Sequence, residues 1–128
     1  MANLAGIRVL VVDDNIDSLD VFATVLRQFG AAVGTARSAR DALTTIATVH
    51  ADVIVSDLAM PHEDGLWLLG QLRQLPHAQR GSVPAIAVTA DRHHYDEKQA
   101  RDAGFDAFLT KPVDPFELAS AIAKLVGR

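Results

Sequence analysis

Acidic, hydroxyl and ammonium side chains stand where four apolar segments of this 128-residue chain end. Asp13 and Asp14 follow the first of these segments, Asp57 and Thr89 close the next two, and Lys111 follows the last. Carboxylates held within several ångströms of one another repel, so such a group either raises a pKa or holds a cation. Oxygen ligands with no histidine or cysteine beside them suit Mg²⁺ better than zinc.

A phosphoryl group is the natural second ligand at such a site, because Mg²⁺ usually binds through one or two carboxylates together with phosphate oxygens. The Lys111 ammonium would balance its charge, and the Thr89 hydroxyl would donate to one of its oxygens. Asp57 stands alone at the end of its segment, whereas Asp13 and Asp14 are neighbours that can share a metal. A carboxylate can accept a phosphoryl group to form an acyl phosphate, so Asp57 is the candidate nucleophile. Such transfer depends mainly on positioning and charge neutralisation, which suits a site without histidine.

The elements that must position these side chains alternate along the chain. Short apolar runs with the composition and length of buried strands cover residues 7–12, 31–36, 52–57, 84–89 and 107–110. Segments with helical periodicity cover about 15–29, 38–49, 64–75, 92–103 and the residues from 114 onward. This alternation predicts five strands and five helices.

Local signals support several of these boundaries. Ser38 with Asp41 three residues later resembles a capping box, and Asp114 followed by Pro115 is typical of a helix start. Pro76 is expected to end the third helix. The apolar face predicted for that helix consists of Leu66, Leu69, Leu72 and Leu75.

Strict alternation predicts an α/β fold, a doubly wound, five-stranded parallel sheet with helices on both faces. The length suits one domain over residues 1–128 and is too short for two. In open parallel sheets, ligands bind outside the carboxyl ends of the strands. The polar residues at the segment ends are therefore expected to meet at one edge of the sheet.

Composition argues against several classes of protein. The net charge is −4 and the basic residues are scattered, so no stripe would neutralise a nucleic-acid backbone. Cysteine is absent, which excludes disulfides and thiolate metal sites and favours a reducing compartment. No apolar run approaches the roughly 20 residues of a membrane helix, and the first residues lack a signal-peptide pattern. We expect a cytoplasmic protein with no direct contact to nucleic acid or membrane.

Five pieces of sequence, taken in order, resemble the receiver domain of bacterial response regulators. They are Val-Leu-Val-Val-Asp13-Asp14-Asn15, Val-Ile-Val-Ser-Asp57-Leu-Ala-Met60-Pro61, Asp64-Gly65, Ala-Val-Thr89-Ala90 and Phe108-Leu-Thr-Lys111-Pro112. The resemblance covers essentially the whole chain. It implies a flavodoxin-like sheet with the strand order 2-1-3-4-5.

The resemblance also implies a role for each residue of the acidic site. Asp57 would be the phosphoacceptor, and Asp13 and Asp14 would hold Mg²⁺ together with Asp57 and the backbone carbonyl of Ala59. Lys111 would pair with the phosphoryl group.

By the same resemblance, Thr89 would be the switching hydroxyl, Phe108 the rotating aromatic and Pro112 a cis proline. The aspartyl phosphate would add charge and acceptor oxygens, Thr89 would move toward them, and Phe108 would turn into the vacated space. The polar helix predicted at 92–103 has few large apolar anchors, which suits either a moving output surface or an ordinary solvated helix. Trp67 lies near the acidic edge and is expected to report metal or phosphate binding by its fluorescence.

The predicted function is that of a phosphoacceptor in two-component or phosphorelay signalling. The donor would be a phosphohistidine on a histidine kinase or histidine phosphotransfer protein, docked on the helix at about 15–29 and the loops over the site. Such a domain promotes only its own phosphorylation and dephosphorylation, so it is not a conventional enzyme. We expect a monomer or a weak, phosphorylation-dependent dimer. Two segments, residues 80–90 and 110–118, are similar to receivers of hybrid sensor kinases. The chain is therefore either free-standing or part of a larger protein.

Three other functions also use features found in this sequence or its fold class, and each is disfavoured. A haloacid-dehalogenase-like phosphatase also uses an aspartate nucleophile with Mg²⁺ and lysine, but it needs a second acid two residues later, where this chain has Ala59. A pseudo-receiver that binds partners without phosphorylation is disfavoured because the acidic, hydroxyl and lysine residues are all present. A dinucleotide-binding domain is disfavoured because Asp13 and Asp14 replace the glycine-rich turn after the first strand.

Overall fold

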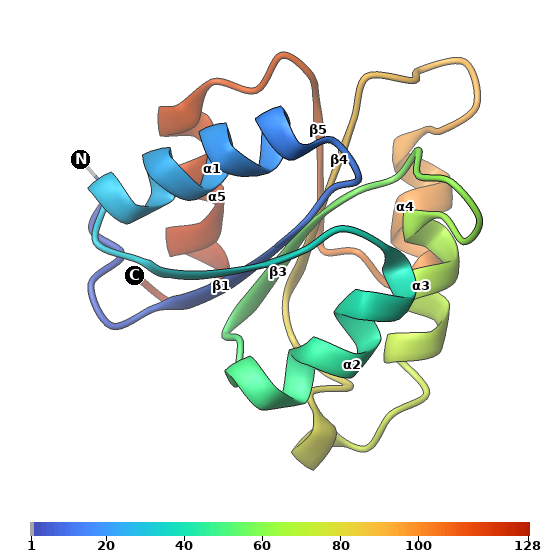
Figure 1. Cartoon of the computed structure of the whole chain (residues 1–128), viewed down its shortest axis with the longest axis horizontal. Helices are drawn as coiled ribbons and strands as arrows, with labels where there is room; N and C mark the ends of the chain where they lie inside the picture. Colours follow the sequence, from blue (N-terminus) through green and yellow to red (C-terminus); the bar gives the residue numbers. More distant parts are fainter. Residues whose placement is uncertain (1) are drawn as a thin grey trace.

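The computed structural model describes residues 2–128 as one parallel sheet covered by helices on both faces (Figure 1). The strands are β1 (Arg8–Val12), β2 (Ala32–Ala36), β3 (Val53–Asp57), β4 (Ala85–Thr89) and β5 (Ala107–Thr110). Their order in the sheet is β2-β1-β3-β4-β5, as predicted. The helices are α1 (Ile16–Gln28), α2 (Ala39–Val49), α3 (Gly65–Leu72), α4 (Glu97–Ala103) and α5 (Pro115–Leu125), and a short 3₁₀ helix spans His77–Gln79.

Each face of the sheet has its own apolar core. In β1, Leu10 and Val12 pack in the cluster beneath α2 and α3, whereas Val9 and Val11 pack in the cluster beneath α1 and α5. Successive strand side chains point to opposite faces, so a strand covered on both sides must be apolar at every position. This explains why the central strands are continuous apolar runs.

The parallel register brings the carboxyl ends of the strands to one edge. Asp57 lies beside Val88, and Thr89 lies beside Thr110. Asp13 follows β1, the neighbour of β3, on the same edge. The sheet therefore places the polar residues of the strand ends together, as the sequence predicted.

Two of the expected helix starts are present with their predicted caps. The Ser38 hydroxyl accepts a hydrogen bond from the Asp41 N–H at 3.1 Å, and the Asp114 carboxylate accepts one from the Phe116 N–H at 2.8 Å. These bonds satisfy amide groups that have no partner inside the helix.

The helix predicted at 92–103 begins later than expected, at Glu97. Asp96 is its N-cap, and the Asp96 and Gln99 side chains complete a reciprocal capping box. Residues 92–94 instead form a turn in which the Asp91 carboxylate accepts from the backbone N–H groups of His93 and His94. Two aspartates five residues apart each offered a cap, and the one with the capping-box partner starts the helix.

The third helix also differs in its end and in its buried face. It ends at Leu72, and the next residues continue as a tighter turn in which the Leu75 N–H donates to the Leu72 carbonyl. Its fully buried leucines are Leu68, Leu69 and Leu72, while Leu66 and Leu75 are half-buried. No helix within residues 2–128 is long and apolar enough to cross a membrane.

Candidate functional site

Three carboxylates meet at the carboxyl edge of the sheet. Asp13 directly follows β1 and is almost fully buried, Asp14 is half-buried, and Asp57 is the last residue of β3. One oxygen from each lies within 4.8 Å of the others. Because β1 and β3 are neighbours in a parallel sheet, their ends bring these residues together although more than forty positions separate them in the chain.

Lys111 is the cation beside this cluster. Its Nζ donates to Asp13 Oδ2 at 2.9 Å and lies 3.5 Å from Asp57 Oδ2. Burial works to lower the pKa of Lys111, but the hydrogen bond to Asp13 and the charges of Asp57 and Asp13 outweigh it and raise the pKa. Lys111 is therefore held in its charged form. The peptide bond between Lys111 and Pro112 is cis, as the resemblance implies.

The electrostatic surroundings of Asp57 disfavour its charged form. Burial is the largest cause, and the negative charge of Asp13 adds to it, whereas Lys111 acts in the opposite direction. The net effect raises the pKa of Asp57 from 3.8 to about 6. The carboxylate is thus poorly compensated by the protein alone, which is the condition under which a carboxyl site gains from a bound cation.

The donor set fits a magnesium ion. The acidic cluster supplies only oxygen atoms, and three carboxylates face a single lysine, which leaves excess negative charge. This is the ligand chemistry that Mg²⁺ prefers. Ala59, whose carbonyl the resemblance assigns to the metal, lies two residues beyond Asp57 in an exposed position.

Thr89 lies on β4, the strand next to the one that Asp57 ends, and Phe108 lies one strand further, on β5. Thr89 ends β4 and is fully buried, and its Oγ1 accepts a hydrogen bond from the Asp91 N–H at 3.0 Å. Phe108 lies on the edge strand β5, is half-buried and packs against the core on the side of α2, α3 and α4. The hydroxyl of Thr89 is therefore tied to the β4–α4 loop in this structure.

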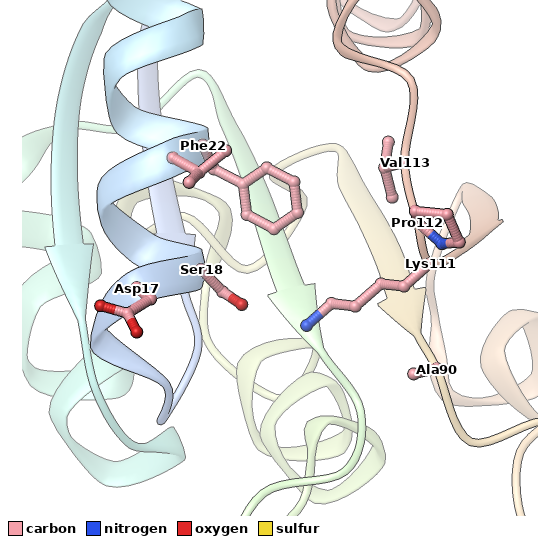
Figure 2. A pocket seen from close by; sticks show the side chains of 8 residues that line it. Asp17, Ser18, Phe22, Ala90, Lys111, Pro112 and Val113 are labelled. Carbon is pink, nitrogen blue, oxygen red and sulfur yellow. The ribbon is translucent and has the colours of Figure 1, made fainter.

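A groove of about 530 Å³ opens beside the acidic cluster, between α1 and the segment that follows β5 (Figure 2). Its apolar walls include Val21 and Phe22 from α1 and Pro112 and Val113 from the other side. Figure 2 shows Lys111 extending from the end of β5 into the space between these walls. The Lys111 ammonium lies 6.0 Å from the centre of the Phe22 ring.

Several contacts around the site were not predicted from the sequence. The Tyr95 hydroxyl donates to Asp64 Oδ2 at 3.0 Å, which joins the β4–α4 loop to the start of α3. Arg40 pairs with Glu63, and its guanidinium lies 5.1 Å from the centre of the Trp67 ring. These partners are 23 or more positions apart, so no local spacing signals them.

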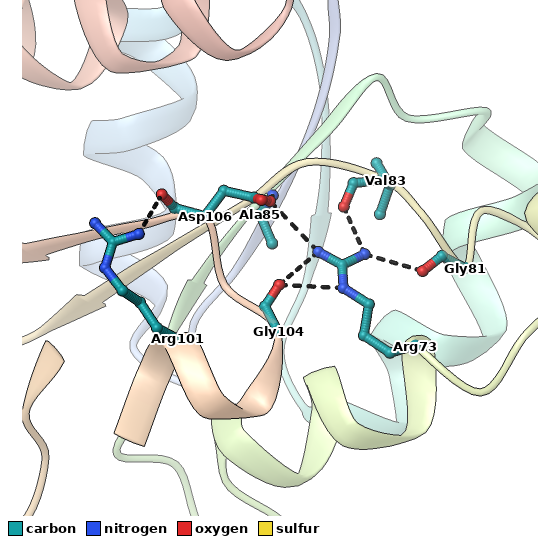
Figure 3. Close-up of polar contacts among 7 residues, drawn as sticks. All are labelled: Arg73, Gly81, Val83, Ala85, Arg101, Gly104 and Asp106. Atoms are coloured by element: carbon teal, nitrogen blue, oxygen red, sulfur yellow. Dashed lines mark hydrogen bonds and ion pairs between the residues drawn. The ribbon is translucent and has the colours of Figure 1, made fainter. Parts of the chain in front are cut away.

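A second charged cluster lies at the opposite end of the sheet (Figure 3). The Arg73 guanidinium donates to the carbonyl oxygens of Gly81, Val83 and Gly104 and contacts Asp106 at 3.4 Å. Asp106 in turn accepts from the Ala85 N–H at 2.9 Å. This cluster joins the end of α3 to the starts of β4 and β5.

Comparison with known proteins places this geometry in a family. Residues 9–123 match the model of the response regulator receiver domain. An uncharacterized 14.6 kDa protein of Leptolyngbya boryana is 42% identical over 92% of this chain and 88% of its own length. Hybrid signal transduction histidine kinase D of Dictyostelium discoideum is 33% identical over 98% of this chain, which spans only 8% of that kinase.

A solved structure supports the same assignment. The chemotaxis protein CheY4 of Vibrio cholerae superposes with a TM-score of 0.85 at 27% identity, covering 94% of this chain and 99% of its own. The chain belongs to the response regulator receiver domain family. It is a receiver domain of two-component signalling, related to the receivers of hybrid histidine kinases.

Proposed function

We propose that Asp57 is the residue of this receiver that takes up the phosphoryl group. The observation that carries the proposal is the meeting of Asp13, Asp14 and Asp57 within 4.8 Å, with Lys111 bound to two of the three. Asp57 ends the central strand β3, whereas Asp13 and Asp14 occupy consecutive positions after β1. This arrangement supports Asp57 as the acceptor and Asp13 and Asp14 as metal ligands.

The transfer itself exchanges one bond for another. An oxygen of the Asp57 carboxylate attacks the phosphorus of a phosphohistidine, a P–O bond forms, the P–N bond breaks, and the imidazole leaves with the electron pair. Lys111 lies 3.5 Å from Asp57 Oδ2 and is placed to pair with the phosphoryl oxygens once the carboxylate becomes an acyl phosphate. The protein supplies position and charge, which are the main requirements of phosphoryl transfer.

Asp13, Asp14, Asp57 and the backbone carbonyl of Ala59 would hold Mg²⁺. When bound, the ion neutralises the charge of the transferring phosphoryl group. Asp13 also fixes the lysine, because its Oδ2 accepts from Lys111 while its Oδ1 accepts from the Asn15 N–H at 3.0 Å.

Thr89 and Phe108 would convert phosphorylation into a change of shape. The Thr89 hydroxyl accepts a hydrogen bond from Asp91 in the β4–α4 loop. New acceptor oxygens on a phosphorylated Asp57 would draw this hydroxyl away. Phe108 would then turn from its half-buried position into the vacated space. The surface near β5 and α4 would change as a result.

The donor would be a histidine kinase or a histidine phosphotransfer protein. The apolar groove between α1 and the segment after β5 would accept it, because this groove opens beside Lys111. We propose that residues 1–128 form one receiver domain, acting in the cytoplasm as a monomer or a weak, phosphorylation-dependent dimer. The domain would catalyse only reactions of its own Asp57 and would not be a conventional enzyme.

Intact mass spectrometry after incubation with acetyl phosphate and Mg²⁺ tests this function. We expect the native chain to gain the mass of one phosphoryl group and Asp57→Asn to gain none. Asp20→Asn is the matched control, because Asp20 is an exposed residue of α1 outside the cluster, and it should behave like the native chain. Equal labelling of the native chain and Asp57→Asn would overturn the proposal.

A further inference from the structure

The β4–α4 loop, residues 90–96, is tied to Thr89 at its start. The Asp91 N–H donates to Thr89 Oγ1 at 3.0 Å, and the Asp91 carboxylate accepts from the N–H groups of His93 and His94. These bonds make one compact turn of the residues that follow β4. A displacement of the Thr89 hydroxyl therefore disturbs the turn directly.

The far end of the same loop is tied to the start of α3. The Tyr95 hydroxyl donates to Asp64 Oδ2 at 3.0 Å, while Asp64 Oδ1 accepts from the Trp67 N–H at 2.8 Å and so caps α3. The Tyr95 ring packs against the apolar core. Burial and the bond to Asp64 raise the pKa of Tyr95 to about 12, so its phenol is a neutral donor at neutral pH.

Asp64 is also close in the chain to the phosphoacceptor. The next residue, Gly65, donates from its N–H to the Leu58 carbonyl at 2.9 Å. A Cβ on Gly65 would lie 2.5 Å from the Asp57 carbonyl oxygen, so the start of α3 packs directly on the end of β3. Tyr95 thus joins the loop of the switching threonine to the segment that follows the acceptor.

We propose that Tyr95 is a positioning residue that holds the β4–α4 loop in its unphosphorylated arrangement through Asp64. The proposal rests on the proposed function, because it needs Thr89 to move toward a phosphoryl group on Asp57. That movement withdraws Oγ1 from Asp91, rearranges residues 90–95, and separates the Tyr95 hydroxyl from Asp64. The bond therefore exists in one of the two states and opposes the switch.

A bond made in only one of two states shifts the equilibrium by its own net free energy. Loss of a hydrogen bond to a carboxylate corresponds to about a ten- to hundredfold change in an equilibrium constant. Tyr95→Phe removes the hydroxyl and keeps the ring. It should therefore bind a phosphoryl analogue about ten- to hundredfold more tightly than the native chain.

Beryllofluoride with Mg²⁺ is the probe, and its affinity is measured by calorimetry for the native chain, Tyr95→Phe and Thr45→Val. Thr45→Val is the matched control, because it removes a hydroxyl that donates to the Asp41 carbonyl within α2, away from both loops. Tighter binding by Tyr95→Phe alone supports the proposal. Equal or weaker binding by Tyr95→Phe overturns it and leaves the proposed function intact. Absence of binding by all three chains overturns both.

A spectroscopic signal separates this role from a merely structural one. Tyr95 is the single tyrosine of the chain, so tyrosine labelled with ¹³C at Cζ gives one NMR signal. We expect that signal to move when beryllofluoride binds the native chain, because the phenol loses its carboxylate acceptor. An unchanged signal in the saturated complex would overturn the proposal.

Discussion

The two ends of the sheet both carry charged side chains, but they differ in how fully the protein pairs those charges. At the amino end, Arg73 donates to three backbone carbonyls and also contacts Asp106 (Figure 3). At the carboxyl end, the buried carboxylates of Asp13 and Asp57 share one lysine. One cluster satisfies its charge from within the protein, whereas the other is left with excess negative charge.

This difference separates a structural cluster from a reactive one. A buried charge with a full set of hydrogen-bond partners stabilises the arrangement that surrounds it and gains nothing from a ligand. A crowded set of carboxylates has a raised pKa and gains from a cation. We therefore expect substitutions at Arg73 to affect folding and substitutions at the acidic cluster to affect binding.

The largest expected effect is that of Arg73→Ala on the free energy of unfolding. The substitution leaves the carbonyl groups of Gly81, Val83 and Gly104 without their partner and should cost about 3–5 kcal/mol in urea or guanidinium unfolding. Arg73→Lys keeps the charge but loses the planar guanidinium, so its free energy of unfolding should lie between those of the native chain and Arg73→Ala. A loss below about 1 kcal/mol for Arg73→Ala would show that the cluster is not structural.

The next effect is that of Asp14→Asn on Mg²⁺ affinity. Loss of one carboxylate ligand should weaken binding about ten- to hundredfold in a calorimetric titration, with little change in unfolding. Asp20→Asn is the control, since it removes a charge from the same part of the chain without touching the cluster. Equal weakening by both variants would mean that only net charge, and no specific ligand, is involved.

The third expected effect is the pH dependence of the free energy of unfolding of the metal-free protein. The pKa of Asp57 is about 6 in the folded protein and 3.8 as its ordinary value, so the folded state binds this proton more tightly. The free energy of unfolding contributed by this group therefore falls as the pH rises from about 4 to about 6. Without divalent cations, Asp57→Asn should be more stable than the native chain by about 1–2 kcal/mol at pH 7, allowing for solvent screening.

The same comparison at pH 4 is its control, because the native carboxyl is then protonated and the difference should nearly vanish. Chemical unfolding at the two pH values checks both statements. A native chain that is more stable than Asp57→Asn at pH 7 would contradict the direction of the pKa shift.

The smallest expected effect is a change of Trp67 fluorescence on Mg²⁺ binding. The backbone N–H of Trp67 donates to the Asp64 cap, and the Trp67 ring lies against Arg40. Its fluorescence should therefore sense the segment that follows Asp57. An emission change should follow the calorimetric binding curve. Constant emission during binding seen by calorimetry would show that Trp67 does not sense the site.

Much of the acidic end could be predicted from the sequence, because its chemistry follows from where strands stop. Asp13, Asp57 and Lys111 each stand at the end of an apolar run, and a parallel sheet must bring such ends to one edge. The strand order needed the family resemblance, since alternation alone does not fix it.

The amino end and the loop contacts could not be predicted in the same way. Arg73 binds backbone carbonyls, which every residue offers, so no residue type marks its partners. The bond between Tyr95 and Asp64 joins positions 31 apart and depends on how two loops meet. The predicted start of α4 is too early because Asp91 and Asp96 are both suitable caps, and of the two only Asp96 has a capping-box partner, Gln99, three residues later.

The identity of the phosphorylated residue tests the central claim most directly. Borohydride reduces an aspartyl phosphate to homoserine, and tandem mass spectrometry of the peptides then locates the reduced residue. After treatment with acetyl phosphate and Mg²⁺, we predict homoserine at position 57 and unchanged aspartate at positions 13 and 14. Homoserine at position 13 or 14, with aspartate retained at 57, would contradict the assignment of the acceptor.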